Sequence, residues 1–179
     1  MTRREAIALI DCPYLRNLSG PTHWADLGCG SGVFTLALAQ LLRTRSIIEA
    51  IDLRPSIVSQ TTSAGIDIRS RTANFVTDHL ALERLDGILM ANALHYVRDQ
   101  PDFLHRIGAS LRTGGAFLLI EYDTDRPVAT WVPFPLSFDT AAALFPTAGF
   151  SAPQRLGWRP SAFGRSNIYA ALALFNPKY

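Results

Sequence analysis

Short apolar runs alternate along the chain with longer segments whose apolar residues recur at helical spacing. Apolar runs of strand length that turn residues bound indicate strands, and the longer periodic segments between them indicate helices. This alternation is typical of a mostly parallel sheet covered by helices, so the predicted class is α/β. The strand-like runs cover residues 23–27, 47–53, 68–75, 85–91, 116–122, 154–158 and 167–175.

Capping residues and helix breakers mark the segments between these runs. Thr2 with Glu5 three residues later is a capping-box signature for a short first helix that ends before Pro13. Pro55 suits the first turn of a helix that Gly65 ends. The other expected helices cover residues 33–42, 99–111 and 137–149.

The last two strand-like runs are separated by only eight residues, 159–166. A parallel pair needs a longer crossover, so the final strand is expected to run antiparallel. We expect one domain over residues 1–179, made of a helical segment (1–22), a ligand-binding core (23–122) and a substrate-side loop, helix and hairpin (123–179).

Composition narrows the classes of function. The chain is 48% hydrophobic and 18% charged, which is enough apolar material for one packed core. The net charge of +2 is spread without a basic run, so no nucleic-acid partner is expected. Two cysteines, Cys12 and Cys29, favour a reducing compartment, and no apolar stretch has the length of a membrane span. We therefore expect a cytoplasmic protein with no membrane partner.

A glycine-rich turn joins the strand at 23–27 to the following helix, with the sequence Asp26-Leu-Gly28-Cys-Gly30-Ser-Gly32. Glycines let a backbone approach a ligand, and a helix N-terminus offers unpaired amides. Val33 stands where the dinucleotide fingerprint needs its third glycine, and the Gly-Lys-Ser/Thr end of a phosphate loop is absent. The turn therefore predicts a ligand that has no phosphate group and that places a cationic group beside Asp26.

Further polar and aromatic residues follow the next two strands. Asp52 ends the strand at 47–53, where a carboxylate can accept both hydroxyls of a ribose. Asn74 and Phe75 end the strand at 68–75 and could offer an amide and a ring face to an adenine. Asp78 is the alternative adenine contact if that strand ends later.

Four landmarks, in order and spacing, resemble the class I S-adenosylmethionine-dependent methyltransferases. They are the glycine turn, Asp52, LDGILMANALHY at 85–96 and LRTGGAF at 111–117, and the resemblance covers residues 24–175. It implies a Rossmann-like three-layer sandwich with seven strands in the order 3-2-1-4-5-7-6, the last antiparallel. It also implies S-adenosylmethionine as cofactor and S-adenosylhomocysteine as product.

The same resemblance assigns the cofactor contacts. It places the methionine amino group by Asp26 and the backbone of Gly28 and Ala91, the ribose on Asp52, and the adenine beside Asn74 and Phe75. Many members of the family have aspartate where Asn74 stands, although an asparagine carbonyl can still accept a hydrogen bond. The expected cofactor-binding residues are Asp26, Gly28, Cys29, Gly30, Gly32, Asp52, Leu53, Asn74, Phe75, Ala91 and Asn92.

The reaction of this family is an in-line displacement in which alignment does most of the work. A base is useful if the acceptor must lose a proton, and His95, after the strand at 85–91, is the first candidate. Its alternative role is structural packing, and a substrate that is already anionic would need no base. Glu121 and Tyr122 are further candidates at the same edge. No metal is expected, because Asn92 and Asp123 offer too few carboxylates for a magnesium site.

Two segments, one after the strand at 116–122 and one after the strand at 154–158, could cover the substrate-binding site, together with one tyrosine. Trp131 and Phe134 suit an apolar or ring-bearing molecule, and Arg159 and Arg165 could pair with a substrate carboxylate. Tyr14 could close a third side. Each has a plain alternative, namely core packing for the aromatic residues and solvated surface positions for the arginines.

These features favour a small-molecule acceptor. The Asn-Pro-Pro-Tyr motif of enzymes that methylate planar amines is absent after the strand at 85–91. The alternatives are a macromolecular substrate, a methyltransferase-like binding module that regulates a partner without turnover, and an NAD-dependent reductase. A homodimer is left open.

Overall fold

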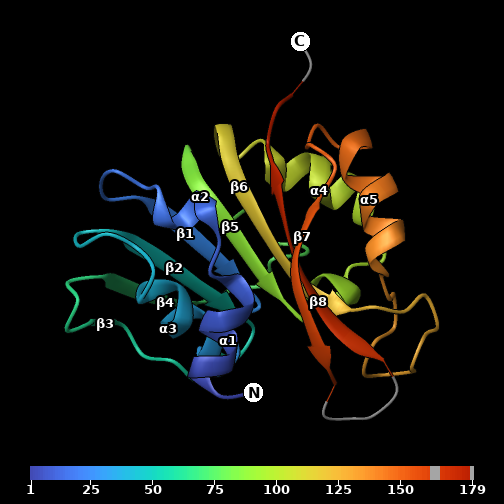
Figure 1. Ribbon diagram of the computed structural model, residues 1–179, viewed down its shortest axis with the longest axis horizontal. Coiled ribbons are helices and arrows are strands. Elements are labelled where there is room, and N and C mark those ends of the chain that lie inside the picture. Colours follow the sequence, from blue (N-terminus) through green and yellow to red (C-terminus); the bar gives the residue numbers. More distant parts are fainter. Residues whose placement is uncertain (162–165, 178–179) are drawn as a thin grey trace.

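The computed structural model describes residues 1–161 and 166–177. Its strands form a single sheet in the order β3-β4-β2-β1-β5-β6-β8-β7, with helices on both faces (Figure 1). The Rossmann-like α/β class is confirmed. The strands are β1 (His23–Leu27), β2 (Ile47–Asp52), β3 (Gln60–Thr61), β4 (Asp67–Thr72), β5 (Leu85–Ala91), β6 (Leu111–Tyr122), β7 (Gln154–Pro160) and β8 (Asn167–Leu174).

Strand directions follow the expected pattern. The neighbouring pairs from β4 to β6 are all parallel, whereas β8 runs antiparallel to both β6 and β7. The antiparallel final strand is therefore confirmed. The sheet has eight strands where seven were expected, because the two-residue β3 adds an antiparallel edge strand beside β4.

Helices cover both faces of the sheet. The helices are α1 (Arg3–Ile10), α2 (Pro13–Arg16), α3 (Val33–Ala39), the 3-10 helix η1 (Leu94–Tyr96), α4 (Gln100–Gly108) and α5 (Phe138–Thr147). The predicted capping box of α1 is present, with Thr2 and Glu5 each accepting the other's backbone N–H. Helices α1 and α3 pack on one face around Trp24, and α4 and α5 pack on the other around Phe117.

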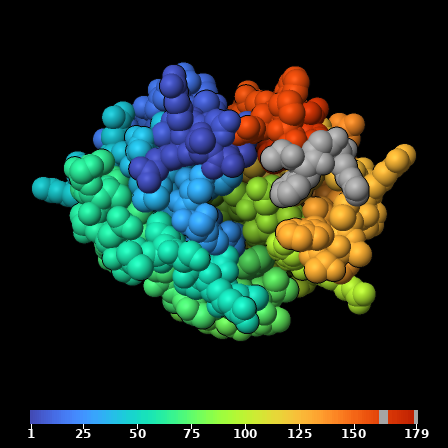
Figure 2. Space-filling view, turned by 90° about the horizontal axis from the view of Figure 1, so that it is seen from below, coloured from blue at the N-terminus to red at the C-terminus, as the bar shows by residue number. Residues whose placement is uncertain are grey.

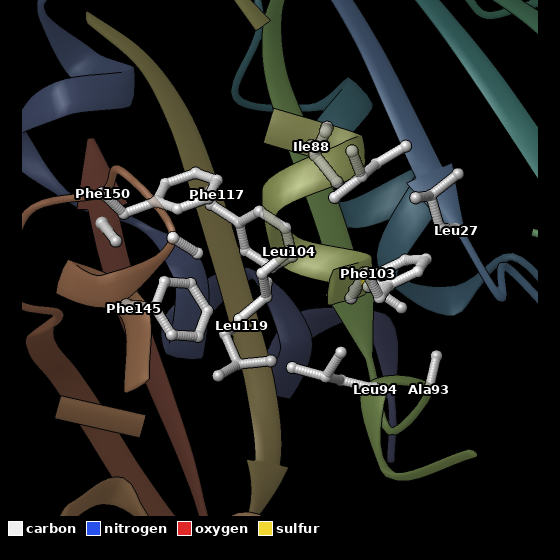
Figure 3. Packing of buried hydrophobic residues seen from close by; sticks show 14 of the residues in the cluster. Leu27, Ile88, Ala93, Leu94, Phe103, Leu104, Phe117, Leu119, Phe145 and Phe150 are labelled. Atoms are coloured by element: carbon white, nitrogen blue, oxygen red, sulfur yellow. The ribbon is translucent and has the colours of Figure 1, made fainter. Parts of the chain in front are cut away.

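The second of these cores is rich in aromatic residues. Phe117 of β6 meets Phe145 of α5 and Phe150 edge to face, with ring centroids 5.3 and 5.6 Å apart (Figure 3). Phe103 and Leu104 of α4 extend the same layer toward β1 and β5. This packing fixes β5 and β6, whose carboxyl ends carry the candidate site.

The helix expected from Pro55 to Gly65 does not form. The chain instead runs as a loop into β3, and Ile57 is the one buried side chain of residues 55–65. Serine, threonine and β-branched residues dominate this segment, and they are poor helix formers. A segment with a single buried side chain also lacks the apolar stripe that holds a helix on a sheet. The short helix α2, which begins at Pro13, was not expected.

The carboxyl ends of β1, β2, β5 and β6 lie at one edge of the sheet, at the bottom of Figure 1. Figure 2 looks onto this edge and shows a hollow between the blue N-terminal part of the chain and the gold segment after β6. In residues 1–161 and 166–177, no helix combines the length and apolar character needed to cross a membrane.

Candidate functional site

A cleft of about 350 Å³ opens at this edge, between the ends of β1 and β5 and the start of α3. It coincides with the predicted position of the glycine turn. The residues that line it are Met1, Asp26, Gly28, Cys29, Gly30, Ser31, Val33, Phe34, Ala91 and Asn92.

The glycine turn has a backbone that other residues rarely adopt. Gly28, Gly30 and Gly32 have φ angles of +83°, +49° and +77°. A Cβ atom on Gly28 would come within 2.5 Å of the Cβ atom of Ala93, whereas one on Gly30 would meet no atom within 4 Å. The main chain at Gly30 therefore faces open space that a ligand can fill.

Asp26 is buried in the floor of the cleft, with 1% of its surface exposed. The hydroxyl of Thr35, on α3, donates a hydrogen bond to its Oδ2 atom, while Oδ1 is buried without a partner. Burial raises the pKa of Asp26 to about 7; the Thr35 hydrogen bond opposes this rise and the charge of Asp52 adds to it. This carboxylate is therefore suited to a cationic hydrogen-bond donor.

Asn92 supplies a second unmatched acceptor in the same cleft. Its φ angle is +52°, and its backbone N–H donates to the carbonyl oxygen of Ile120 at 2.8 Å. Its side-chain Oδ1 atom is buried without a partner. An unsatisfied buried acceptor costs free energy until a donor reaches it. Two such acceptors, Asp26 Oδ1 and Asn92 Oδ1, fit the ammonium group of an amino acid.

Asp52 holds the glycine turn from the adjacent strand. Its Oδ2 atom accepts the backbone N–H of Gly30 and its Oδ1 atom accepts that of Arg54, both at 2.9 Å. The next residue, Leu53, is 59% exposed. Asp52 thus shapes the turn, and its predicted contact with a ribose stays a prediction.

The residues expected at the adenine lie in the turn after β4. Asn74 Oδ1 accepts the backbone N–H of Val76 at 3.0 Å, and Asp78 Oδ2 accepts the backbone N–H of Asn74 at 2.8 Å. Phe75 is buried, and its ring would lie 3.4 Å from a Cβ atom on Gly28. Phe75 is therefore beside the cleft. The carbonyl of Asn74 is engaged by the backbone, so the adenine contact of Asn74 or Asp78 stays a prediction.

Cys29 lies in the middle of the turn and is 8% exposed. Burial raises the pKa of its thiol to about 12, with the charges of Asp26 and Asp52 adding to the rise. The thiol is therefore protonated at neutral pH and lines the cleft as a small neutral side chain.

His95 and Glu121 form a buried pair at the ends of β5 and β6. His95 Nδ1 lies 2.8 Å from Glu121 Oε2, and the side chains are 2% and 1% exposed. Glu121 also accepts the backbone N–H groups of His95, at 3.2 Å, and Tyr122, at 3.3 Å. Within residues 1–161 and 166–177, the Nε2 atom of His95 has no hydrogen-bond partner.

Two tyrosines flank this pair. The ring centroids of Tyr96 and Tyr122 lie 4.4 and 6.0 Å from that of His95. Tyr96 is 49% exposed and Tyr122 is half-buried, and burial raises the pKa of Tyr122 above its ordinary value. The imidazole of His95 therefore has an aromatic ring beside it from each of these two tyrosines.

The segment after β6 that was predicted to cover the substrate lies beside the same pair. The backbone N–H of Phe134 donates to the carbonyl oxygen of His95 at 3.0 Å, and Arg98 lies over the Phe134 ring, 5.7 Å from its centroid. Trp131 is 69% exposed. Phe134 is therefore in place to contact a molecule near His95, and Trp131 lies farther out.

Other predicted substrate contacts lie elsewhere. The hydroxyl of Tyr14 donates to the carbonyl oxygens of Asp86 and Gly114, near the starts of β5 and β6, so Tyr14 is at the opposite edge of the sheet. Arg159 donates to Glu5 at 2.9 Å and lines a second hollow between α1 and β7. Arg165 lies outside the described residues. We therefore leave Tyr14 out of the proposed substrate site.

Several residues of the site carried no signal in the sequence. Thr35 orients Asp26 across one strand-to-helix turn, a contact that depends on where α3 begins. Phe34 and Met1 line the cleft, and Tyr96 stands beside His95. An alternation of polar and apolar residues does not indicate such contacts.

Solved structures share this architecture. A methyltransferase from Methanosarcina mazei has a TM-score of 0.67 at 15% identity and covers 94% of this chain and 99% of its own. An arsenic(III) methyltransferase from Chlamydomonas reinhardtii has a TM-score of 0.69 at 16% identity, covering 97% and 73%. Human N-acetylserotonin methyltransferase, solved with S-adenosylmethionine, has a TM-score of 0.64 at 21% identity, covering 96% and 51%. This chain therefore shares its fold with S-adenosylmethionine-dependent methyltransferases.

Sequence comparison gives the family. Residues 25–117, more than half of the chain, match the family described as "Methyltransferase domain", and the protein belongs to that family. An uncharacterized methyltransferase of Mycobacterium tuberculosis, Rv0089, is 30% identical over 101 residues, covering 55% of this chain and 50% of its own. Trans-aconitate 2-methyltransferase of Mycolicibacterium gilvum is 33% identical over 94 residues, covering 52% and 35%. The chain thus spans half or less of the length of these curated relatives.

Proposed function

We propose that the protein transfers the methyl group of S-adenosylmethionine to a hydroxyl or other proton-bearing group of a small organic molecule, with His95 as the proton acceptor. The observation that carries this proposal is the buried His95–Glu121 pair, which lies at the ends of β5 and β6, at the edge of the sheet that holds the cleft. A carboxylate that holds one imidazole nitrogen leaves the other available as a base.

The cofactor's place follows from the unmatched groups of the cleft. Asp26 Oδ1 and Asn92 Oδ1 would hold its ammonium group, and the open space at Gly30 would take its chain. Asp52 would face the ribose, with Phe75 and Asn74 at the adenine. When bound, S-adenosylmethionine supplies a sulfonium methyl group that a nucleophile can take by direct displacement.

The pair orients the imidazole and stabilises its charged form. With a proton on Nδ1 shared with Glu121 Oε2, His95 Nε2 keeps its lone pair and can accept the proton of the attacking group. Glu121 would then stabilise the imidazolium. The backbone N–H groups of His95 and Tyr122 hold Glu121 in this orientation.

A small acceptor is favoured by the aromatic residues that surround His95. Tyr96, Tyr122 and Phe134 offer ring faces near His95, which suits a planar or apolar molecule.

A carboxylate acceptor is the second candidate. Arg98, exposed over the Phe134 ring, has no carboxylate partner within the described part of the chain and could hold an acidic group. A relative named for trans-aconitate, a carboxylic acid, is consistent with this candidate. A carboxylate is already ionised at neutral pH and needs no base.

The test is methyl transfer from labelled S-adenosylmethionine to a metabolite extract and to a panel of phenols, alcohols and carboxylic acids. We expect label in a proton-bearing acceptor, with kcat reduced by 10²-fold or more in His95→Gln, in the range typical of a lost general base. Cofactor affinity should change little in that variant, since His95 does not line the cleft. Full activity of His95→Gln with a carboxylic acid would favour the second candidate. Cofactor binding without any labelled product would support the binding module instead.

A further inference from the structure

The edge that holds the cleft also gathers the exposed apolar side chains. Within residues 1–161 and 166–177, seven large hydrophobic side chains are at least 36% exposed. Met1 lines the cleft, Trp158 lines the second hollow between α1 and β7, and Leu53, Tyr96, Val128 and Trp131 follow strands whose carboxyl ends lie at this edge, whereas Val58 lies on the loop before β3. These six, which we call the apolar rim, are Met1, Leu53, Tyr96, Val128, Trp131 and Trp158.

The apolar rim comes from separate segments that converge only in the fold. Leu53 follows β2, Tyr96 follows β5, and Val128 and Trp131 follow β6. Trp158, on β7, pairs with Tyr169 of β8, which pairs with Glu121 near the end of β6. Exposed apolar side chains that gather at one edge mark a docking surface more often than scattered ones do.

The backbone holds Trp131 outward. Val128 and Val132 form an antiparallel bridge, and the N–H of Trp131 donates to the carbonyl oxygen of Val128 at 3.1 Å. Val132 is 8% exposed, whereas Trp131 is 69% exposed. Thr130, a β-branched residue, has a φ angle of +72°, which costs free energy. The turn thus presents a tryptophan to the surroundings although its neighbour is buried.

Arginines accompany the apolar rim. Six exposed arginines lie within three residues of a rim residue. Arg155 pairs with Asp123, and the other five have no carboxylate partner within the described ranges. These five are Arg3, Arg4, Arg54, Arg98 and Arg126.

Several acidic residues of this edge are turned toward the protein. Asp125 accepts hydrogen bonds from Ser137 and Thr140, and Asp123 pairs with Arg155 at 3.1 Å. Glu5 pairs with Arg159 at 2.9 Å, and Asp52 accepts two backbone N–H groups. Asp52, Asp125 and the exposed N-cap residue Asp99 have no ion pair within the described ranges, so the five unpaired arginines beside the apolar rim outnumber three carboxylates and leave an excess of positive charge.

The sequence predicted no membrane partner because no apolar stretch could span a bilayer, but docking on a membrane surface needs no such stretch. We propose that this edge docks on a lipid bilayer that contains anionic lipids, with the apolar rim in the interface and the five arginines at the headgroups. Tryptophan and tyrosine favour that interface, and arginine is attracted to anionic headgroups. A second copy of the chain seated symmetrically on this face would bring the same arginines together, which disfavours it. Docking would open the cleft toward the bilayer, from which an apolar acceptor could enter.

The test measures co-sedimentation of the full chain with vesicles of phosphatidylcholine alone and of phosphatidylcholine mixed with phosphatidylglycerol. We expect binding to the mixed vesicles that falls as salt rises. The double substitution Arg54→Gln/Arg126→Gln should weaken this binding by about twenty-five-fold, from about five-fold per arginine. The matched control, Arg45→Gln/Arg84→Gln, removes two exposed arginines that precede β2 and β5, at the opposite edge, and should bind as the parent chain does.

Tryptophan emission reports on the rim separately. Mixed vesicles should shift the emission to shorter wavelength in the parent chain and by less in Trp131→Ser, while circular dichroism and cofactor binding show that the variants are folded. No sedimentation with mixed vesicles, or equal weakening in the control, overturns the proposal. A stable dimer that Trp131→Ser dissociates would also overturn it, because the face would then be an interface between copies. Each readout is independent of methyl transfer, so it does not depend on the proposed acceptor.

Discussion

His95 and Glu121 face each other across the ends of two parallel strands, with Nδ1 and Oε2 2.8 Å apart and almost no surface exposed. Removing the Glu121 carboxylate leaves the Nδ1–H group of His95 and the backbone N–H groups of His95 and Tyr122 without their acceptor. We therefore expect Glu121→Ala to lower the free energy of unfolding by about 1–3 kcal/mol. Urea denaturation measures this change.

The control for that prediction is an exposed ion pair on the same sheet. Asp67 pairs with Arg69 at 2.9 Å, with the side chains 42% and 51% exposed. Exposed pairs contribute about 0–1 kcal/mol, so Asp67→Ala should change the free energy of unfolding little. Equal effects of the two substitutions would show that burial does not strengthen the His95–Glu121 pair.

The glycines of the turn should separate folding from binding. Gly28→Ala places a Cβ atom 2.5 Å from Ala93 at a φ angle of +83°, so we expect a loss of stability. A Cβ atom on Gly30 meets no atom within 4 Å, so Gly30→Val should cost stability through backbone strain at φ +49° alone, and it should abolish cofactor binding by filling the cleft. Thermal unfolding and calorimetric titration with S-adenosylhomocysteine distinguish the two effects.

Gly20→Ala is the control for both glycine variants, because a Cβ atom there meets no atom within 4 Å and its φ angle is not positive. It should bind the cofactor normally. Normal cofactor affinity in Gly30→Val would remove the turn from the site.

Asp26 should make stability depend on pH. Its pKa is about 7 in the folded protein and about 3.8 in the unfolded chain, so the folded state binds the proton more tightly. The free energy of unfolding should therefore fall as pH rises from about 4 to about 7, and level off above that. Denaturation of the parent chain and of Asp26→Asn across this range isolates the contribution of this carboxyl group.

The same titration predicts the direction of cofactor binding with pH. An ammonium group favours the ionised carboxylate, so affinity for S-adenosylhomocysteine should rise as pH rises toward about 7. Below that pH, binding should release a proton, which calorimetry in buffers of different ionisation enthalpy detects. Affinity that is independent of pH would mean that Asp26 does not meet the ammonium group.

Asp52 links the cofactor to the stability of the turn. Asp52→Ala removes the acceptor of the Gly30 and Arg54 N–H groups, so we expect weaker cofactor binding. Calorimetric titration measures the loss. Unchanged affinity would show that neither the turn nor the ribose depends on this carboxylate.

The sequence predicted best where local pattern and burial agree. Strands β1 and β5 begin and end where expected, because both are apolar runs bounded by polar or turn residues and both lie inside the sheet. The helix predicted over residues 55–65 was wrong. Pro55 and Gly65 are residue types that suit the two ends of a helix, but the residues between them form no apolar stripe. Residues that suit the two ends of a helix do not define one when the apolar residues between them lack helical spacing.

The site was predictable as far as the backbone determines it. The glycine spacing and the position of Asp52 at a strand end depend on local chain geometry; the glycine turn lines the cleft, and Asp52 accepts the backbone N–H of Gly30 in that turn. Long-range pairings were not predictable in this way. Arg159 was expected to face a substrate, but α1 places Glu5 beside it, across more than 150 residues of sequence. Tyr14 reaches the starts of β5 and β6 for the same reason.

The most direct test of the account is a crystal structure of the protein with S-adenosylhomocysteine. It should show the amino group of the ligand within hydrogen-bond distance of Asp26 Oδ1 and Asn92 Oδ1, with its backbone beside Gly30. Density for the ligand outside this cleft, or an amino group that leaves both oxygens unpaired, would contradict the assignment of the site.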